Sequence, residues 1–273
     1  MLFVLRRPAG PLAAFVQVLW FYEGFARPHA KERLLPDGSM ELVINLRDDE
    51  IRVWDRRDLT QYTRLDGAVL VGPHTEYFVI DTAEQQCVMG VHFRPGGGFP
   101  FLLMPADEMH GQQVALGDLW GGFARELRER LLALDSMNAR FELLEAALLR
   151  QVRRPLGFHP AVRYAIREFG ARSRRTVADV VEETGLSARR FIEVFRAQVG
   201  MSPKQYSRVR RFQRIVQGLG MERDIDWCGV ALDAGYSDQS HLIHDFRAIS
   251  GISPGVWAEL RTEHRNHVPM MGA

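Results

Sequence analysis

Cysteine and lysine are both scarce in this chain. Two cysteines occur among the 273 residues, Cys87 and Cys228, and they lie in different halves of the sequence. A disulfide framework and a cysteine-based zinc site are therefore disfavoured, because each needs clustered cysteines; we expect Cys228 to be a small packed residue. Lysine occurs only at Lys31 and Lys204. Arginine thus carries nearly all the positive charge, and its planar fork suits phosphates and base edges.

Long hydrophobic runs are also missing. The apolar stretch from Leu12 to Tyr22 is interrupted by Gln17. It is too short to span a bilayer, and no clear small-residue cleavage site follows it. We interpret this stretch as an amphipathic helix, and we expect a cytoplasmic protein without membrane contact.

The net charge of +1 conceals two halves of opposite sign. Residues 1–152 hold 16 Lys and Arg against 21 Asp and Glu, whereas residues 153–273 hold 19 against 13. An acidic half joined to a basic half predicts that only one of them meets a polyanion.

The acidic half has the pattern of short strands followed by helices. Runs that favour strands occupy residues 41–46, 51–54, 68–71, 77–80 and 87–93, separated by glycine and proline turns. Such spacing predicts a small barrel or sandwich. From about residue 119 to 152 the apolar positions recur with helical spacing. We therefore predict the α+β class, with a cupin-like barrel domain and its helices over 1–152 and a connecting helix and linker over 153–175.

The basic half contains a repeat. The sequence Phe-Arg-Ala-Gln-Val-Gly-Met-Ser-Pro at 195–203 recurs as Phe-Arg-Ala-Ile-Ser-Gly-Ile-Ser-Pro at 246–254, an offset of 51 residues. Each copy follows a glycine turn, at Gly185 and at Gly235. Two similar helix-turn-helix units in tandem predict an all-α module, over about 176–265, that binds DNA in two adjacent places.

Capping residues delimit the first unit. Thr176 and Asp179 form a capping-box pair, Gly185 ends that helix, and Ser187 caps the next. On this second helix Phe191 and Phe195 share the apolar face, so four polar residues point outward as candidate DNA contacts. They are Arg189, Arg190, Glu193 and Arg196.

The second unit repeats the arrangement with other polar residues. Its candidate DNA contacts are Gln239, Ser240, His244 and Arg247; glutamine is able to make paired contacts with adenine. A helix capped by Ser202 joins the two units and presents Arg208 and Arg211 to phosphates. Its length of roughly 22 Å would hold two recognition helices about one DNA turn apart, in successive major grooves.

Residues 176–262 resemble the DNA-binding domain of the AraC/XylS-type transcription regulators. The residues that carry the resemblance are Ala231-Leu232-Asp233-Ala234-Gly235-Tyr236-Ser237-Asp238-Gln239-Ser240-His241-Leu242 and Gly251-Ile252-Ser253-Pro254. The first half resembles one branch of the same family through Leu35-Pro36-Asp37-Gly38-Ser39, Val71-Gly72-Pro73-His74-Thr75 and Val91-His92-Phe93-Arg94-Pro95-Gly96. The resemblance implies binding to double-stranded promoter DNA, RNA polymerase as a partner and a homodimer. The first recognition helix departs from the family pattern at Ile192, Glu193 and Val194.

A small-molecule effector at the N-terminal half is a further expectation. Candidate effector-binding residues are Trp20, Tyr22, Trp54, His74, Tyr77, His92 and Arg94. The competing interpretation is that the aromatic residues pack the barrel and that Arg94 belongs to a tight glycine turn. We expect no metal and no cofactor, because His92-Phe93-Arg94 is not the paired-histidine motif of a metal-binding cupin.

Two other functions remain open. A cupin-like enzyme or a DNA-repair methyltransferase could be fused to a DNA reader, but no clustered ligands occur and Cys87 lacks the Pro-Cys-His setting of the latter. We therefore expect no enzyme. An interaction module that binds DNA weakly and acts through partner proteins is the second alternative. Glu193 favours it, since a carboxylate beside phosphates is repelled unless it meets a cytosine amine.

Overall fold

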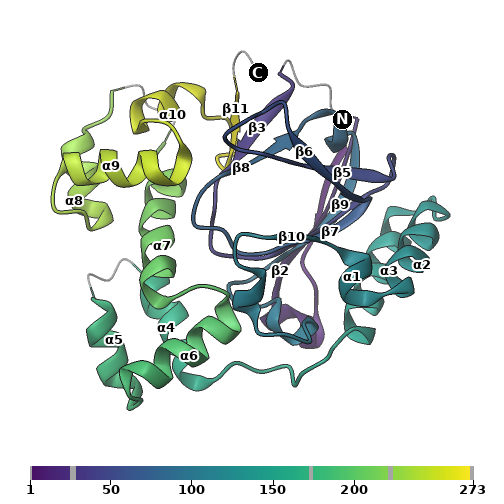
Figure 1. Ribbon diagram of the computed structural model, residues 1–273, viewed down its shortest axis with the longest axis horizontal. Coiled ribbons are helices and arrows are strands. Elements are labelled where there is room, and N and C mark those ends of the chain that lie inside the picture. Colours follow the sequence, from purple (N-terminus) through teal and green to yellow (C-terminus); the bar gives the residue numbers. More distant parts are fainter. Residues whose placement is uncertain (1, 25–28, 172–174, 221–223, 271–273) are drawn as a thin grey trace.

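The computed structural model describes residues 2–24, 29–171, 175–220 and 224–270. A β-rich N-terminal part lies beside a helical C-terminal part (Figure 1), so the predicted α+β class is confirmed. Across the described residues, no helix combines the length and the apolar character that a membrane crossing requires.

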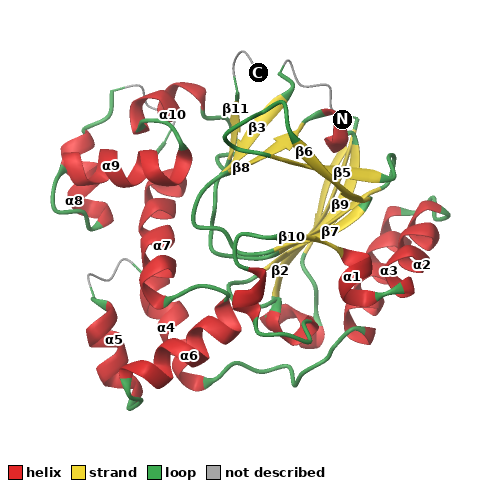
Figure 2. Cartoon of the chain, viewed as in Figure 1, coloured by secondary structure: helices red, strands yellow, loops and turns green. Residues whose placement is uncertain are grey.

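Three sheets build the N-terminal part (Figure 2). The largest has the order β1-β2-β9-β4-β7-β10, and the others have the orders β11-β3-β8 and β5-β6. The sheets do not close into one barrel. The strands are β1 (Leu2–Arg6), β2 (Val16–Glu23), β3 (Lys31–Leu34), β4 (Glu41–Asn45), β5 (Glu50–Trp54), β6 (Tyr62–Asp66), β7 (Ala68–Val71), β8 (Phe78–Asp81), β9 (Cys87–Phe93), β10 (Gln113–Ala115) and β11 (His267–Pro269).

The sequence over Leu12 to Tyr22 forms a strand, and the helix predicted there is wrong. A short 3-10 turn, η1 (Gly10–Ala14), precedes β2, which pairs with β1 on one side and β9 on the other. A short apolar run does not distinguish the helical period from the strand period. The β-branched and aromatic residues that fill β2 fit a sheet better, and hydrogen bonds to both neighbouring strands decide the outcome.

Helices cover one side of the largest sheet. They are α1 (Leu116–Trp120), α2 (Gly122–Leu132) and α3 (Met137–Arg150), in the region where the helical spacing predicted them. Leu127, Leu131, Phe141 and Leu144 are buried in one core with strand residues such as Leu42. Short 3-10 turns, including η2 (Ala83–Gln85), η3 (Phe99–Phe101) and η4 (Ala106–Met109), complete this part.

The C-terminal part consists of two helical units that are joined by α7 (Figure 1). Its helices are α4 (Pro160–Gly170), α5 (Val177–Thr184), α6 (Ala188–Val199), α7 (Pro203–Gly218), α8 (Trp227–Ala234), α9 (Gln239–Ser250) and α10 (Pro254–Leu260). The predicted caps are confirmed: Thr176 and Ser202 form capping boxes, and Ser187 caps α6. Cys228 is exposed, so its predicted packing is wrong; it lies in the first turn of α8.

The chain returns to its N-terminal part after the second unit. Strand β11 pairs antiparallel with β3, placing His267 opposite Leu34. Between the two parts, the Gln213 amide donates a hydrogen bond to the Pro36 carbonyl at 2.8 Å, and the backbone N–H of Tyr77 donates to the Ile249 carbonyl at 2.8 Å. The two parts are thus connected by the linking helix α7, by α9 and by β11.

Candidate nucleic-acid interface and ligand cavity

Helix α6 presents its polar residues to solvent. Phe191 and Phe195 are fully buried beneath it, whereas the Arg189 and Arg190 side chains are 91% and 63% exposed. Both arginines pair with Glu193, at 3.2 Å and 3.5 Å. Such exposed pairs contribute less than about 1 kcal/mol, so little free energy holds either arginine to Glu193.

Arg196, the fourth candidate on α6, faces the N-terminal part. Its Nη2 lies 2.9 Å from Asp107 Oδ2 in η4, while about half of its side chain stays exposed. At the C-terminal end of this helix, Gly200 lies against Pro73 and Ala106. The first recognition helix therefore contacts the N-terminal part through both a charge and a close backbone approach.

Helix α9 exposes the four candidate contacts of the second unit. Its N-cap, Asp238, accepts a hydrogen bond from the backbone N–H of His241 at 2.7 Å, and Leu242 and Phe246 are buried on the opposite face. The exposed candidates are Gln239, Ser240, His244 and Arg247.

The arginines of α7 are anchored by a buried carboxylate in α9. Arg208 Nε lies 2.5 Å from Asp245 Oδ1, and the Tyr236 hydroxyl donates to Oδ2 at 2.9 Å. Arg211 stacks 4.5 Å above the Tyr236 ring. Burial, followed by the Asp245 charge, raises the pKa of Tyr236. The sequence did not predict this role for Asp245, because Arg208 and Arg211 belong to another helix and no local pattern links them to it.

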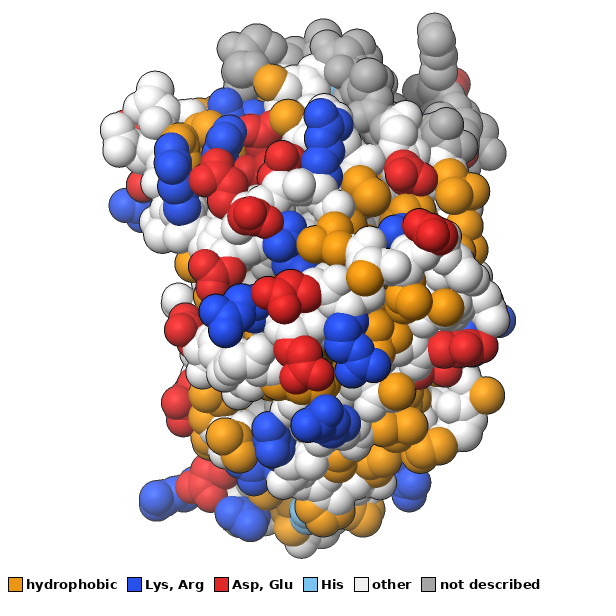
Figure 3. Space-filling model, turned by 90° about the vertical axis from the view of Figure 1, so that its right-hand side faces the viewer, with side chains coloured by type: hydrophobic (Ala, Val, Ile, Leu, Met, Phe, Trp, Pro, Cys, Tyr) orange, Lys and Arg blue, Asp and Glu red, His pale blue; other side chains and the backbone are white. Residues whose placement is uncertain are grey.

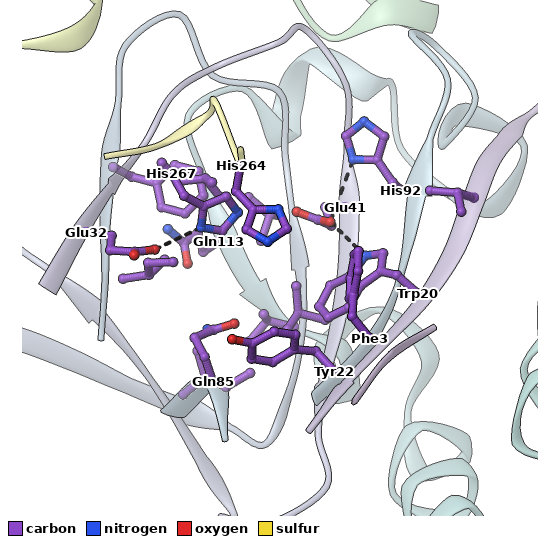
Figure 4. A pocket seen from close by; sticks show the side chains of 18 of the residues that line it. Phe3, Trp20, Tyr22, Glu32, Glu41, Gln85, His92, Gln113, His264 and His267 are labelled. Carbon is purple, nitrogen blue, oxygen red and sulfur yellow. Dashed lines mark hydrogen bonds and ion pairs between the residues drawn. The ribbon is translucent and has the colours of Figure 1, made fainter. Parts of the chain in front are cut away.

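A cavity of about 250 Å³ lies inside the N-terminal part. Phe3, Trp20 and Tyr22 line it, together with His264 and His267 from the segment after α10 (Figure 4). His264 packs edge-on against Phe3, with ring centroids 5.7 Å apart. Gly90 stands opposite Trp20 in the sheet, where an added Cβ would come within 2.5 Å of the indole ring. Glycine at this position therefore leaves room for the Trp20 side chain.

Glu41 and His92 are polar groups that reach the cavity. The Trp20 indole N–H donates to Glu41 Oε1 at 2.9 Å, and His92 Nδ1 lies 3.6 Å from the same oxygen. His92 Nε2 lies 2.9 Å from Asp37. Burial opposes the charge of His92, but Asp37 and Glu41 outweigh it and raise the pKa of His92 well above its ordinary value.

A second carboxylate in the cavity wall joins the two ends of the chain. Glu32 is buried, with His29 Nε2 at 2.7 Å from Oε1 and His267 Nδ1 at 2.9 Å from Oε2. Residue His267 belongs to β11 and Glu32 to β3, so this contact accompanies the pairing of the two strands.

The structure separates the predicted effector residues into three groups. Trp20, Tyr22 and His92 line the cavity of about 250 Å³. A neighbouring hollow of about 500 Å³ is lined by Trp54, His74 and Tyr77. Arg94 is exposed and donates a hydrogen bond to the Ala13 carbonyl at 3.0 Å.

Histidine His74 is neutral near pH 7. Burial lowers its pKa to about 4, and its Nδ1 lies 2.7 Å from the Gly72 carbonyl. It therefore brings no positive charge to the neighbouring hollow.

The cavity contains polar residues that the sequence did not indicate. They are Glu32, Glu41, Gln85, Gln113, His264 and His267. Of these residues, only Glu41 could have been recognised from the sequence, because it is a charged residue at the start of an otherwise apolar strand. Within the described residues no cluster of three or more histidine, cysteine or acidic side chains has the arrangement of a metal site.

Two protein families match separate parts of the chain. Residues 6–115 match a domain of unknown function, DUF6597, and residues 180–259 match a helix-turn-helix domain. No curated protein matches the chain.

Among solved structures, the chain is similar to ToxT from Vibrio cholerae. The apo form has a TM-score of 0.46 at 10% identity, covering 90% of this chain and 97% of the other. ToxT bound to (E)-4-(8-methylnaphthalen-1-yl)but-3-enoic acid has a TM-score of 0.46 at 9% identity, covering 88% and 97%. An unsaturated fatty acid-bound form has 0.42 at 9% identity, covering 94% of each chain.

Proposed function

We propose that this chain acts as an AraC/XylS-type transcription regulator, which the resemblance of its sequence and the helix-turn-helix match over residues 180–259 support. Helices α6 and α9 enter successive major grooves on one face of promoter DNA, and a small molecule in the N-terminal cavity modulates that binding. The observation that carries the proposal is the pair of matching helices, each with a buried aromatic face and an exposed polar face.

Each helix has a distinct role in this proposal. On α9, Gln239 near the N-terminal end reads a base, because the first residues of a recognition helix reach base edges. On α6, Arg189 and Arg190 release Glu193 and bind phosphates or base edges of the DNA instead. The α7 residues Arg208 and Arg211 contact phosphates while Asp245 holds them in place.

We propose a division of labour along the chain. Residues 1–152 sense the effector, 153–175 connect, and the following residues to about 265 bind DNA. Helix α4 supports the first helix-turn-helix unit, since Val162 and Phe169 are buried in one core with Phe191. The segment beyond α10 supports communication, because His264 and His267 line the cavity.

A homodimer is part of the proposal. Leu132 in α2 and Leu149 in α3 are 41% and 45% exposed. Figure 3 shows the side of the molecule to which these helices belong, where hydrophobic side chains lie between charged ones. A second copy that packs against these helices would place two DNA-binding parts on one promoter.

The test is fluorescence anisotropy of the full chain on its own upstream intergenic DNA and on a shuffled duplex, at low and at physiological salt. We expect a preference for the native duplex that persists at physiological salt. Gln239→Ala should lower that preference by ~1–3 kcal/mol, the range for one lost bidentate base contact. Gln61→Ala, an exposed glutamine in the N-terminal part, is the matched control.

Other outcomes point elsewhere. Equal, steeply salt-dependent binding to both duplexes would reveal phosphate contacts without base reading on the DNA tested. Absence of binding to either duplex would favour the interaction module, for which the Arg189–Glu193–Arg190 cluster is the supporting observation.

A further inference from the structure

We propose that the N-terminal cavity binds a small ligand that combines an aromatic body with a positively charged amine, and that Glu41 pairs with the amine. This inference rests on the proposed function, because it treats the cavity as the effector site. It adds the chemical class of the effector and the residue that selects it.

The first argument is the charge of the cavity wall. Glu32 and Glu41 are its acidic side chains, and the described residues that line it include no lysine or arginine. Each of its three histidines has a carboxylate nearby: His92 lies between Asp37 and Glu41, His267 lies against Glu32, and His264 lies 3.8 Å from Glu263. An anionic ligand would lose its hydration without a permanent positive partner, and burying an unpaired charge is costly.

The second argument is the second oxygen of Glu41. Both polar contacts of this carboxylate, with Trp20 and His92, involve Oε1. Oε2 makes no hydrogen bond within the part of the chain that the structure describes. A carboxylate has about four lone-pair positions, and Figure 4 shows Glu41 extending into the middle of the cavity between Trp20 and His264. An ammonium group would satisfy this oxygen.

The charge balance of this cluster supports the same conclusion. Asp37 and Glu41 flank a single histidine, which carries a proton because these two carboxylates raise its pKa. His92 lies nearer to Asp37, at 2.9 Å, than to Glu41, at 3.6 Å, and the charge of Arg210 also acts on Asp37. Glu41 is therefore the less compensated of the two carboxylates, and it is the one that lines the cavity.

The third argument is the aromatic wall. Phe3 packs edge-on against Tyr22 with ring centroids 6.0 Å apart, and Trp20 lies beside them in Figure 4. Aromatic faces attract cations within about 6 Å and bind flat rings. A cavity of about 250 Å³ is slightly smaller than the ~300–1,000 Å³ of common ligand pockets, so one or two fused rings with a short amine are the appropriate size.

The test compares three ligands of one shape. Isothermal titration calorimetry on the full chain without DNA would use tryptamine, tryptophol and indole-3-acetate, which carry an amine, a hydroxyl and a carboxylate. We expect tryptamine to bind ~10-fold or more tighter than tryptophol, the scale of a hydrogen bond to a charged group, and indole-3-acetate to bind weakest.

Variants assign the preference to Glu41. Glu41→Gln keeps the size of the side chain and an acceptor for the Trp20 indole, so it should bind tryptamine and tryptophol about equally. Glu129→Gln, on the exposed surface of α2, removes the same charge far from the cavity and should keep the preference.

The proposal is overturned if indole-3-acetate binds tightest, if the three ligands bind alike or not at all, or if Glu41→Gln retains the amine preference. Because the unmodified chain already gives the order of affinities, the test does not depend on how well Glu41→Gln folds. DNA anisotropy remains a separate measurement, so a failure here is distinguishable from a failure of DNA binding.

Discussion

Protonated His92 lines the cavity and forms an ion pair with Asp37, in the loop after β3. It lies 2.9 Å from Asp37, and the Asp37 carboxylate also accepts the backbone N–H of Ser39 at 2.9 Å. Burial opposes the charge of Asp37, but His92 outweighs it, and the pKa of Asp37 is lowered. The pair therefore holds opposite charges near neutral pH.

A pH dependence of stability follows from this pair. The raised pKa of His92 adds stability that is complete below about pH 6.5, its unfolded value, and that is lost as the pH rises through the folded value. The lowered pKa of Asp37 adds stability that is present above about pH 4 and lost in acid. Between about pH 4 and pH 6.5, the stabilisation from His92 and the stabilisation from Asp37 are therefore both fully present.

We therefore expect the free energy of unfolding to fall between pH 6 and pH 9 by more in the unmodified chain than in His92→Gln. The difference should be ~1.5–3 kcal/mol, the scale of a hydrogen bond to a charged group. Urea unfolding followed by circular dichroism at several pH values measures it. His244→Gln, on the exposed face of α9, should behave like the unmodified chain. Equal slopes in all three proteins would contradict the assignment.

Among the helices, the two recognition helices end in glycines that touch the N-terminal part. Gly200 has φ +84° and lies against Pro73, and Gly251 has φ +74° and lies against the Tyr77 ring. Gly185, at the end of α5, has a similar φ of +68° but open space around it. A side chain at Gly185 would therefore meet only the strain of a left-handed backbone. A side chain at Gly200 or Gly251 would meet this strain and also a clash with the N-terminal part.

Replacing each glycine by alanine would distinguish these effects. Gly185→Ala should cost ~1–2 kcal/mol of stability, the cost of a left-handed conformation with a side chain. Gly251→Ala should cost ~1–3 kcal/mol more, because the new Cβ would lie 2.5 Å from the Tyr77 ring. Thermal unfolding compares the two variants. A similar loss in both would mean that Tyr77 moves aside freely.

Elements of the C-terminal part were predictable because their signals are local. Thr176 and Ser202 lie three residues from their capping partners Asp179 and Gln205, and the glycine turns stand next to the helices that they end. The β2 strand was not predictable in this way. Its apolar run fits two periods, and its neighbours β1 and β9 had to be known before the strand could be recognised.

The cavity illustrates why part of the site was missed. Trp20, Tyr22 and His92 were chosen for their chemistry and do meet there. Glu32 and His267 are 235 positions apart in the sequence, and no local pattern brings such a pair together. Arg94 was chosen because of the glycines that follow it, yet its guanidinium binds the Ala13 carbonyl.

At the scale of the whole molecule, an ion pair joins the N-terminal part to the first recognition helix, beside the close approach at Gly200. Arg196 of α6 lies 2.9 Å from Asp107. An arginine that is held there has to leave this partner before it meets DNA. The contact thus lowers DNA affinity whenever Arg196 belongs to the interface.

We expect Asp107→Asn to raise DNA affinity by about two- to fivefold, which corresponds to a partly exposed ion pair of ~0.4–1 kcal/mol. Anisotropy on the native duplex measures the change. Glu108→Gln removes the same charge from an exposed neighbour in η4 and should change the affinity less. An equal rise in both variants would indicate long-range charge alone, and no rise would place Arg196 outside the interface.

The pairing of β11 with β3 also sets an order of events during synthesis. Leu34 is synthesised long before His267, the residue that lies opposite it in the sheet. Until the second helix-turn-helix unit has emerged, β3 has only β8 beside it, and the wall that His264 and His267 supply to the cavity is missing. A nascent chain therefore completes its cavity only after its helix-turn-helix units have been made, so the cavity and these helices are complete at nearly the same moment.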